Sequence, residues 1–293
     1  MSDSRMKTLG VKVQKSYGER FRLALIELGL FDRNRRVMSD EGQVYLPVLP
    51  LNGNAKSMLL KIADFELVEA DFKPEERRLS PEDILGYSPS FEIVGDIAIV
   101  EQEKAEEVAA VLMSVYKSIK TVIAPISDVE GEFRTRRFRH VAGQLRTTTI
   151  HREHGLRYCI DLEGAYFSPR LGTERLRVAR QIHPGDIVLD MFAGVGPFAL
   201  LIAKMGANVI AIDKNPVAVR CLRENARLNK VHAEILEGDA AELASRYENA
   251  ADHIIMNLPH SASQFLVPAI NAAKTGGIVH YYSIASVEDL YAD

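Results

Sequence analysis

The C-terminal half of the chain is predicted to have an α/β fold with a parallel, Rossmann-like sheet, and three observations lead to this prediction. From about residue 171, short apolar runs alternate with segments of helical spacing, which is the pattern of consecutive βαβ units. The run at residues 186–190 leads into the glycine-rich turn Gly194-Val-Gly196 and then a helix, as in nucleotide-binding folds. The next apolar run, at residues 208–213, ends in Asp213, where an acid can hold a ribose diol.

Residues 8–67, taken first in chain order, are predicted to form a small N-terminal α/β module. Apolar residues at Phe21, Leu25 and Leu28 give a helical spacing, and the run at 44–49 is typical of an edge strand because it contains Pro47. The polar, proline-containing stretch at 68–90 is predicted to be a linker.

Residues 91–170 are predicted to be an α+β domain packed on the catalytic domain, which occupies 171–293. One face of a helix carries Val108, Leu112, Val115 and Ile119 and is expected to pack in the core. The stretches with strand patterns are 91–100, 121–126, 146–150 and 157–162, around a helix at 103–119. Helices on one face of a mainly antiparallel sheet fit this order.

The acids around the glycine turn favour S-adenosylmethionine over a dinucleotide as cofactor. Asp190 lies four residues before Gly194, where a carboxylate would repel a pyrophosphate but suits an ammonium group. Asp239 follows the run at 233–238 and is placed to meet an adenine amino group. Asn257 follows another strand pattern, at the sheet edge where ligands of open α/β folds bind. A nicotinamide oxidoreductase remains the alternative for this half of the chain.

Charge is distributed unevenly along the chain. The chain has 293 residues and a net charge of −4, yet residues 131–180 contain eleven arginines, no lysine and five acids. Such a basic stretch predicts a nucleic-acid partner, with a solvated charged face as the alternative. The two cysteines, Cys159 and Cys221, give neither a disulfide framework nor a metal pattern, and no apolar run is long enough to span a membrane. We expect a cytoplasmic, monomeric enzyme that binds no metal and no membrane.

Three further blocks carry a family resemblance: GEFRTR at 131–136, AYFSPRLGTER at 165–175 and NLPHSA at 257–262. With the glycine turn, they resemble the archaeal and eukaryotic tRNA (guanine-N1)-methyltransferases that modify position 37, over residues 8 to 285. The resemblance implies a class I S-adenosylmethionine-dependent methyltransferase preceded by α+β RNA-binding domains. It also implies that the module at 8–67 is a separate tRNA-recognition domain.

The resemblance implies roles that the chemistry of guanine explains. N1 carries a proton at neutral pH, so methylation there needs a base for the proton and a cation for the charge on O6. The matching positions are Glu174 for the base and Arg134 for the cation, while Asn257 and Pro259 match a loop that orients a planar amine. Glu174 has a plainer alternative, an ion pair with Arg170 or Arg177 on one helix turn.

The remaining site predictions concern the two ligands. We expect the cofactor site to contain Tyr166, Asp190, Phe192, Gly194, Gly196, Asp213, Asp239 and Asn257. We expect the tRNA to contact Arg136, Arg137, Arg170 and Arg175, the last two either through phosphates or by holding Glu174.

The C-terminus departs from the family pattern. The chain stops at Asp293, just after a strand predicted at 277–284, whereas family members continue with a helix and two more strands. We expect either a C-terminally shortened chain or a partner that covers this strand. The missing elements make a catalytically impaired tRNA-binding protein one alternative function. Another is an aminocarboxypropyl transferase that has the same fold and cofactor and acts on a tricyclic guanosine at the same tRNA position.

Overall fold

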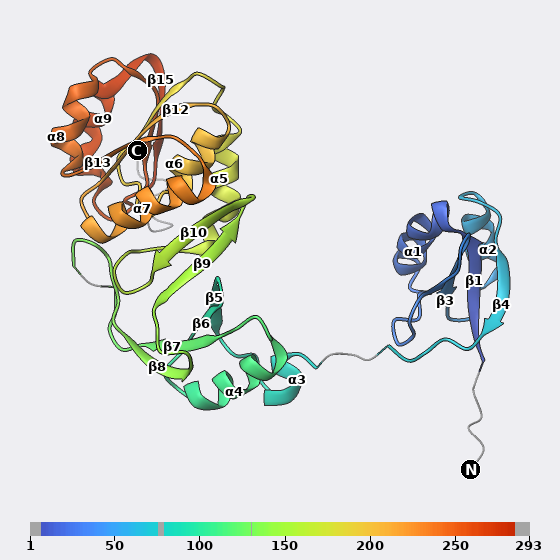
Figure 1. The fold of residues 1–293 in the computed structure, drawn as a ribbon. Coiled ribbons are helices and arrows are strands. Elements are labelled where there is room, and N and C mark those ends of the chain that lie inside the picture. The colour runs from blue at the N-terminus through green and yellow to red at the C-terminus, as the bar shows by residue number, and fades with distance from the viewer. Residues whose placement is uncertain (1–6, 76–78, 130, 285–293) are drawn as a thin grey trace. The chain divides into compact units, whose positions relative to one another are not determined.

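The structure, a computed structural model, describes residues 7–75, 79–129 and 131–284 (Figure 1). It divides into two compact units, residues 1–79 and 80–293, which are described separately below. No helix in these described ranges combines the length and the apolar character that a membrane crossing requires.

The first unit is an antiparallel sheet with two helices. The sequence predicted a small α/β module with one helix and an edge strand at 44–49, whereas β3 lies between two other strands. The strand order is β2-β3-β1-β4, and the apolar faces of α1 and α2 supply Phe21, Leu25 and Leu59 to its core. Asn52 caps α2 by accepting a hydrogen bond from the backbone of Ala55 at 2.8 Å. Its elements are β1 (Thr8–Gln14), α1 (Gly18–Glu27), β2 (Met38–Ser39), β3 (Gln43–Pro47), α2 (Gly53–Leu60) and β4 (Glu66–Ala70).

The predicted linker at 68–90 is wrong at both ends. β4 pairs with β1 inside the first unit, and the fully buried ring of Phe72 fills the space beside Gly10, where an added Cβ would come within 2.4 Å of it. On the other side, Ser80 and Asp83 form a capping box that begins α3 (Pro81–Leu85). Prolines and short polar residues start helices as readily as they mark linkers. Residues 76–78 lie outside the described part.

The second unit begins with a four-stranded sheet of order β5-β6-β7-β8, covered by α4 (Ala105–Val115). The single strand predicted at 91–100 is a hairpin of β5 (Phe91–Val94) and β6 (Ile97–Val100), because Gly95 turns the chain with φ +60°. β7 (Thr121–Pro125) was predicted, whereas β8 (Phe138–Gly143) was not.

A separate hairpin, β9 (Thr148–Glu153) and β10 (Leu156–Asp161), packs on the nucleotide-binding fold, and it also shares a core with Val94, Ile97 and Ile123 of the preceding sheet. The side chain of Asn225, fully buried on α7 (Pro216–Asn229), accepts from the amide of Cys159 at 2.6 Å. It also donates to the carbonyls of Cys159 at 3.1 Å and Val195 at 2.9 Å. One amide therefore joins the hairpin, the helix and the glycine turn, and the fold boundary lies nearer residue 148 than the predicted 170.

The remaining residues form the predicted Rossmann-like domain. Its five strands are parallel, in the order β13-β12-β11-β14-β15. α5, α6, α7 and the β9–β10 hairpin pack on one face, and α8 and α9 pack on the other. The elements are α5 (Gly172–Ala179), β11 (Ile187–Asp190), α6 (Pro197–Lys204), β12 (Asn208–Asp213), β13 (Glu234–Glu237), α8 (Ala240–Ala244), β14 (Ala251–Met256), α9 (Leu266–Ala272) and β15 (Ala273–Tyr281).

Candidate active site

The strand order reverses between β11 and β14, which places the glycine turn and Asn257 at one crevice. Gly196 has φ +92°, and a Cβ there would lie 2.2 Å from a methyl group of Leu222, so helix packing and backbone conformation both require glycine. Gly194 has φ +57°, a Cβ there would meet only the carbonyl oxygen of Tyr166, at 3.9 Å, and its amide donates to Asp213 Oδ2 at 2.6 Å. The turn is thereby fixed to the end of the neighbouring strand.

A first cavity lies along this turn. Of the residues predicted to hold the cofactor, Tyr166, Phe192, Gly194, Asp213, Asp239 and Asn257 line it. Asp213 caps the turn, and Asp239 begins α8 by accepting from the amide of Ala241 at 2.9 Å. Burial raises the pKa of Asp213, so a cationic or hydroxyl-bearing ligand that compensates its charge would bind favourably there. The lining thus suits a nucleoside with a positively charged tail.

Asp190 lies behind the cavity rather than on its wall. It is 1% exposed, and burial raises its pKa to about 7. Its Oδ2 meets no hydrogen-bond partner within the described residues, while Oδ1 accepts from the amide of Phe192 at 3.4 Å. A buried carboxylate oxygen without a partner is costly, and an ammonium group would relieve it. The residues present therefore fit the predicted cofactor.

A second cavity adjoins the first and shares part of its wall. The residues lining both are Arg134, Tyr166, Phe167, Ser168, Leu171 and Asn257. Pro259, Arg136 and Arg170 line the second cavity only, as does Phe138 of β8. Two adjoining spaces with an aromatic and polar partition can place a donor and an acceptor molecule face to face.

Arg134 is the cation at the junction of the two cavities. Its guanidinium carbon lies 5.3 Å from the centre of the Tyr166 ring, on a turn where its own φ is +53°. Its Nε and Nη1 are buried and, among the described residues, neither meets a hydrogen-bond acceptor. A left-handed conformation and unpaired buried donors are both unfavourable, and such features concentrate at functional sites.

Glu174, the predicted base, is set back from the cavities. It does not appear among the described residues that line either one. Arg177 binds its carboxylate through two hydrogen bonds of 2.7 Å, which was the plainer alternative, and the Tyr282 hydroxyl donates to Oε1 at 2.6 Å. The bonds from Arg177 are the largest cause that lowers the pKa of Glu174, so it is ionised at neutral pH.

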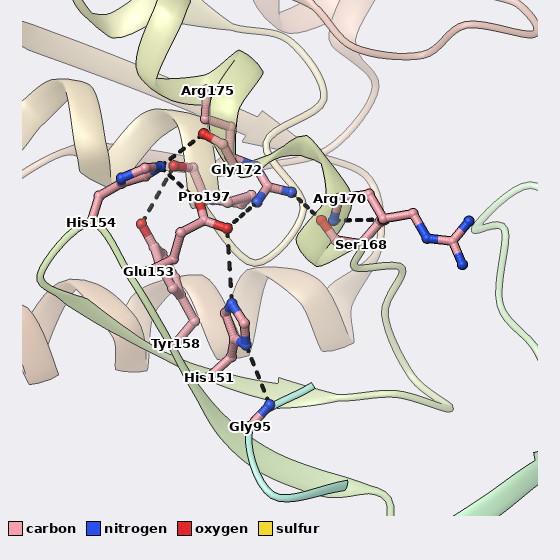
Figure 2. A network of polar contacts seen from close by, with 10 residues as sticks. All are labelled: Gly95, His151, Glu153, His154, Tyr158, Ser168, Arg170, Gly172, Arg175 and Pro197. Carbon is pink, nitrogen blue, oxygen red and sulfur yellow. Dashed lines mark hydrogen bonds and ion pairs between the residues drawn. The ribbon is translucent and has the colours of Figure 1, made fainter. Parts of the chain in front are cut away.

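Arg175 corrects one sequence prediction. It is 2% exposed, and its guanidinium donates to Glu153 Oε2 and to the carbonyl of Ser168, both at 2.7 Å (Figure 2). It also lies 5.0 Å from the centre of the Phe167 ring. Arg175 lines the first cavity and its Nε meets no acceptor among the described residues, but a guanidinium that is 2% exposed and paired through both Nη atoms is not placed to contact a tRNA phosphate. It holds the segment 166–168, which is the shared wall of the two cavities.

Arg170 behaves differently although it lies in the same block. Its side chain is 79% exposed, points away from the network in Figure 2, and contacts Glu92 at 3.0 Å. Arg136 and Arg137 are exposed as well. For these three arginines, contact with the phosphates of tRNA stays a prediction.

Sequence reasoning missed several residues at the site. Glu153 and His151 come from β9, and neither carried a motif that marked it. Lys214 forms ion pairs with Glu132 at 2.6 Å and with Asp239 at 3.7 Å. It follows Asp213 directly, and this position beside a predicted cofactor-binding residue was the one sequence feature that could have indicated it. Tyr282 lies 108 residues from Glu174, and nothing local indicated their contact.

Family models match nearly the whole chain. The TRM5/TYW2 methyltransferase domain matches residues 149–292, the tRNA methyltransferase 5 N-terminal domain matches 10–56, and the TYW2 N-terminal domain matches 76–147. The start at 149 agrees with the packing of the β9–β10 hairpin on the catalytic fold.

Individual proteins agree with these models. A tRNA (guanine(37)-N(1))-methyltransferase, Trm5b of Pyrococcus abyssi, is 41% identical over 97% of this chain and 86% of its own length. A solved complex of aTrm5 and tRNALeu has a TM-score of 0.65 and 34% identity, covering 94% of this chain and 87% of that one. A tRNA(Phe) (4-demethylwyosine(37)-C(7)) aminocarboxypropyltransferase of Pyrococcus horikoshii is 33% identical, over 69% of this chain and 74% of its own length.

Proposed function

Because the chain belongs to the TRM5/TYW2 methyltransferase family, we propose that it transfers a methyl group from S-adenosylmethionine to N1 of guanosine 37 in tRNA. Trm5b of Pyrococcus abyssi, whose name states this activity, matches almost the full length of the chain. The aminocarboxypropyltransferase matches a smaller share of the chain, 69%, and residues 10–56 match the N-terminal domain of tRNA methyltransferase 5.

The observation that carries the proposal is the unpaired guanidinium of Arg134 between two adjoining cavities. Guanine gathers negative charge on O6 when N1 loses its proton. A buried cation with two free donors stabilises that charge most strongly where water is excluded. The ring of Tyr166 packs against the guanidinium of Arg134, and both residues line the two cavities.

S-adenosylmethionine, when bound in the first cavity, supplies a methyl group activated by its sulfonium. Asp213 and Asp239, which line this cavity, would hold it, and Asp190 lies behind the wall with an unpartnered oxygen that favours positive charge nearby. Their negative charge matches a cofactor with two positive groups.

The guanine base is expected in the second cavity, with Asn257 and Pro259 orienting it. Asn257 lines both cavities, and the carbonyl of Pro259 accepts from the amide of Ile284 at 3.3 Å, which fixes the loop. Glu174, held ionised by Arg177, is the final acceptor of the N1 proton. Base 37 must leave its stack to enter, at a cost of a few kcal/mol.

An experiment with two labelled cofactors separates this function from its nearest rival. Unmodified tRNA is incubated with the protein and S-adenosylmethionine labelled either in the methyl group or in the carboxyl group. We expect only the methyl label to reach the tRNA. Incorporation of the carboxyl label would instead identify an aminocarboxypropyl transferase, and incorporation of neither label, with tRNA binding intact, would identify a binding protein.

The role of Glu174 is tested by replacing its carboxylate with an amide. Glu174→Gln keeps the size of the side chain but removes the proton acceptor, so we expect turnover to fall roughly 100-fold or more. Affinity for S-adenosylmethionine and for tRNA should stay near the wild-type values. Turnover near that of the wild type would remove Glu174 from the mechanism.

A further inference from the structure

The proton acceptor and the base cavity are separated by one side chain. Glu174 is not among the described residues lining the second cavity, and Arg177 occupies both of its carboxylate oxygens. The ring of Tyr282, in contrast, lines that cavity, and its hydroxyl donates to Glu174 Oε1 at 2.6 Å. A proton on a base in the cavity therefore meets the tyrosine before it meets the carboxylate.

Tyr282 is held in this position by the fold. It follows β15 directly, and its ring packs against Phe198 of α6 with the ring centres 6.1 Å apart. Burial, followed by the contact with Glu174, raises the pKa of its hydroxyl above the ordinary value. The hydroxyl is therefore protonated at neutral pH and has a proton to give to Glu174. Arg177 also interacts with the hydroxyl oxygen, which has two lone pairs and can accept a second proton donor.

We propose that Tyr282 relays the guanine N1 proton to Glu174 during methyl transfer. This inference rests on the proposed function and adds a catalytic residue to it. The N1 proton passes to the Tyr282 oxygen while the tyrosine's own proton passes to Glu174 Oε1. The N1 electron pair then forms the bond to the methyl carbon, and the bond between that carbon and sulfur breaks with its electrons left on sulfur. The tyrosine ends neutral, and Glu174 carries the proton.

The test compares Tyr282→Phe with the neighbouring change Tyr281→Phe in the full chain. Tyr281 is the last residue of β15 and is 41% exposed, so it controls for loss of a phenol hydroxyl on the same segment. The measurement is the single-turnover rate of methyl transfer to unmodified tRNA, at saturating S-adenosylmethionine and tRNA. The dissociation constants of both ligands are measured in parallel.

We expect Tyr282→Phe to slow the single-turnover rate about 10- to 100-fold, the lower part of the range for a proton-transfer group, with both dissociation constants changed less than about threefold. Tyr281→Phe should stay within about twofold of the wild type. Glu174→Gln combined with Tyr282→Phe should be no slower than Glu174→Gln alone, because the two residues act in one relay.

Two results would overturn the relay while leaving the proposed function intact. One is a wild-type rate for Tyr282→Phe alongside a slow Glu174→Gln. The other is a double variant whose loss equals the product of the two single losses. A wild-type chain that transfers no methyl group would instead overturn the proposed function, and the relay with it.

Discussion

Two arginines, Arg175 fully buried and Arg134 partly exposed, flank the same wall of the site, and they differ in how their guanidinium groups are paired. Arg175 is paired with Glu153 and with the carbonyl of Ser168, and it packs on Phe167. Arg134 packs on Tyr166, but its Nε and Nη1 meet no acceptor within the described residues. Arg175 pairs both of its terminal nitrogens, leaves only Nε without an acceptor among the described residues, and fixes the wall, whereas the unpaired Nε and Nη1 of Arg134 are donors that a ligand could use.

The two arginines also differ in backbone conformation. Arg175 lies in α5, where its conformation is regular, while Arg134 has φ +53° in a turn. Unfavourable backbone and unpaired polar groups persist only where function requires them or the surroundings impose them. The comparison therefore assigns stability mainly to Arg175 and chemistry mainly to Arg134, and four changes test that division.

The largest effect is expected from Arg175→Met. It leaves Glu153 buried without its cation, which costs about 3–5 kcal/mol of the free energy of unfolding. Urea denaturation measures the loss. The double variant Glu153→Leu with Arg175→Met should recover much of it, because no buried charge then remains unpaired. An Arg175→Met variant as stable as the wild type would contradict the structural role assigned to Arg175.

Arg134→Ala should act on rate instead. Removing a preorganised donor from developing charge typically slows the chemical step about 100- to 1000-fold, or about 3–4 kcal/mol. The free energy of unfolding should change by less than about 1 kcal/mol, because the side chain's buried donors gain no partner from folding. Single-turnover kinetics and urea denaturation on the same preparation test both halves. A destabilised variant with near-normal rate would reverse the roles of the two arginines.

A buried histidine pair extends the comparison, because burial there favours the uncharged form of the side chains. His253 Nδ1 and His280 Nε2 lie 3.1 Å apart across β14 and β15. Burial, then the proximity of His253 and Arg177, lowers the pKa of His280 to about 4, although Glu174 acts in the opposite direction. The unfolded chain protonates first as the pH falls, so stability is complete above pH 6.5 and decreases toward pH 4, by at most about 3 kcal/mol.

Urea denaturation between pH 7.5 and 4.5 measures this dependence. His280→Asn should be less stable at pH 7.5 but should show a shallower decrease on acidification. An equal decrease in both proteins would assign the pH dependence to other groups.

The smallest effect is expected at the exposed arginines Arg136 and Arg137, whose side chains are not buried. Arg136→Ala or Arg137→Ala should weaken tRNA binding about equally for different tRNAs. Each change should reduce the slope of log binding constant against log salt concentration by about one, because one phosphate contact is lost. Arg139→Ala is the matched control, because Arg139 is engaged by Glu106 at 2.6 Å. If neither change alters the slope, these arginines do not contact phosphates.

Local signals made much of the fold predictable. The glycine turn, the acids at Asp213 and Asp239, and every strand of the parallel sheet follow from runs of a few residues. The linker prediction failed because serine followed by proline, as at Ser80 and Pro81, is typical of a helix N-terminus as well as of a loop. Gly95 divided a predicted strand because a single residue with positive φ can reverse the chain.

The site was predictable only where motifs are continuous in sequence. Burial of Arg175 depends on Glu153 in a different element, and the approach of Tyr282 to Glu174 spans 108 residues. Charge type alone could not separate a paired arginine from a free one. Folding decides which guanidinium finds a carboxylate, and that is the distinction on which the mechanism depends.

Mass spectrometry of tRNA nucleosides after reaction with the protein and S-adenosylmethionine tests the central claim most directly. It should be run on tRNA with guanosine at position 37 and on the same tRNA with adenosine there. We predict 1-methylguanosine in the first tRNA, at position 37, and no new methylated nucleoside in the second. Methylation at another atom or position, or the same product from both tRNAs, would contradict the proposed reaction.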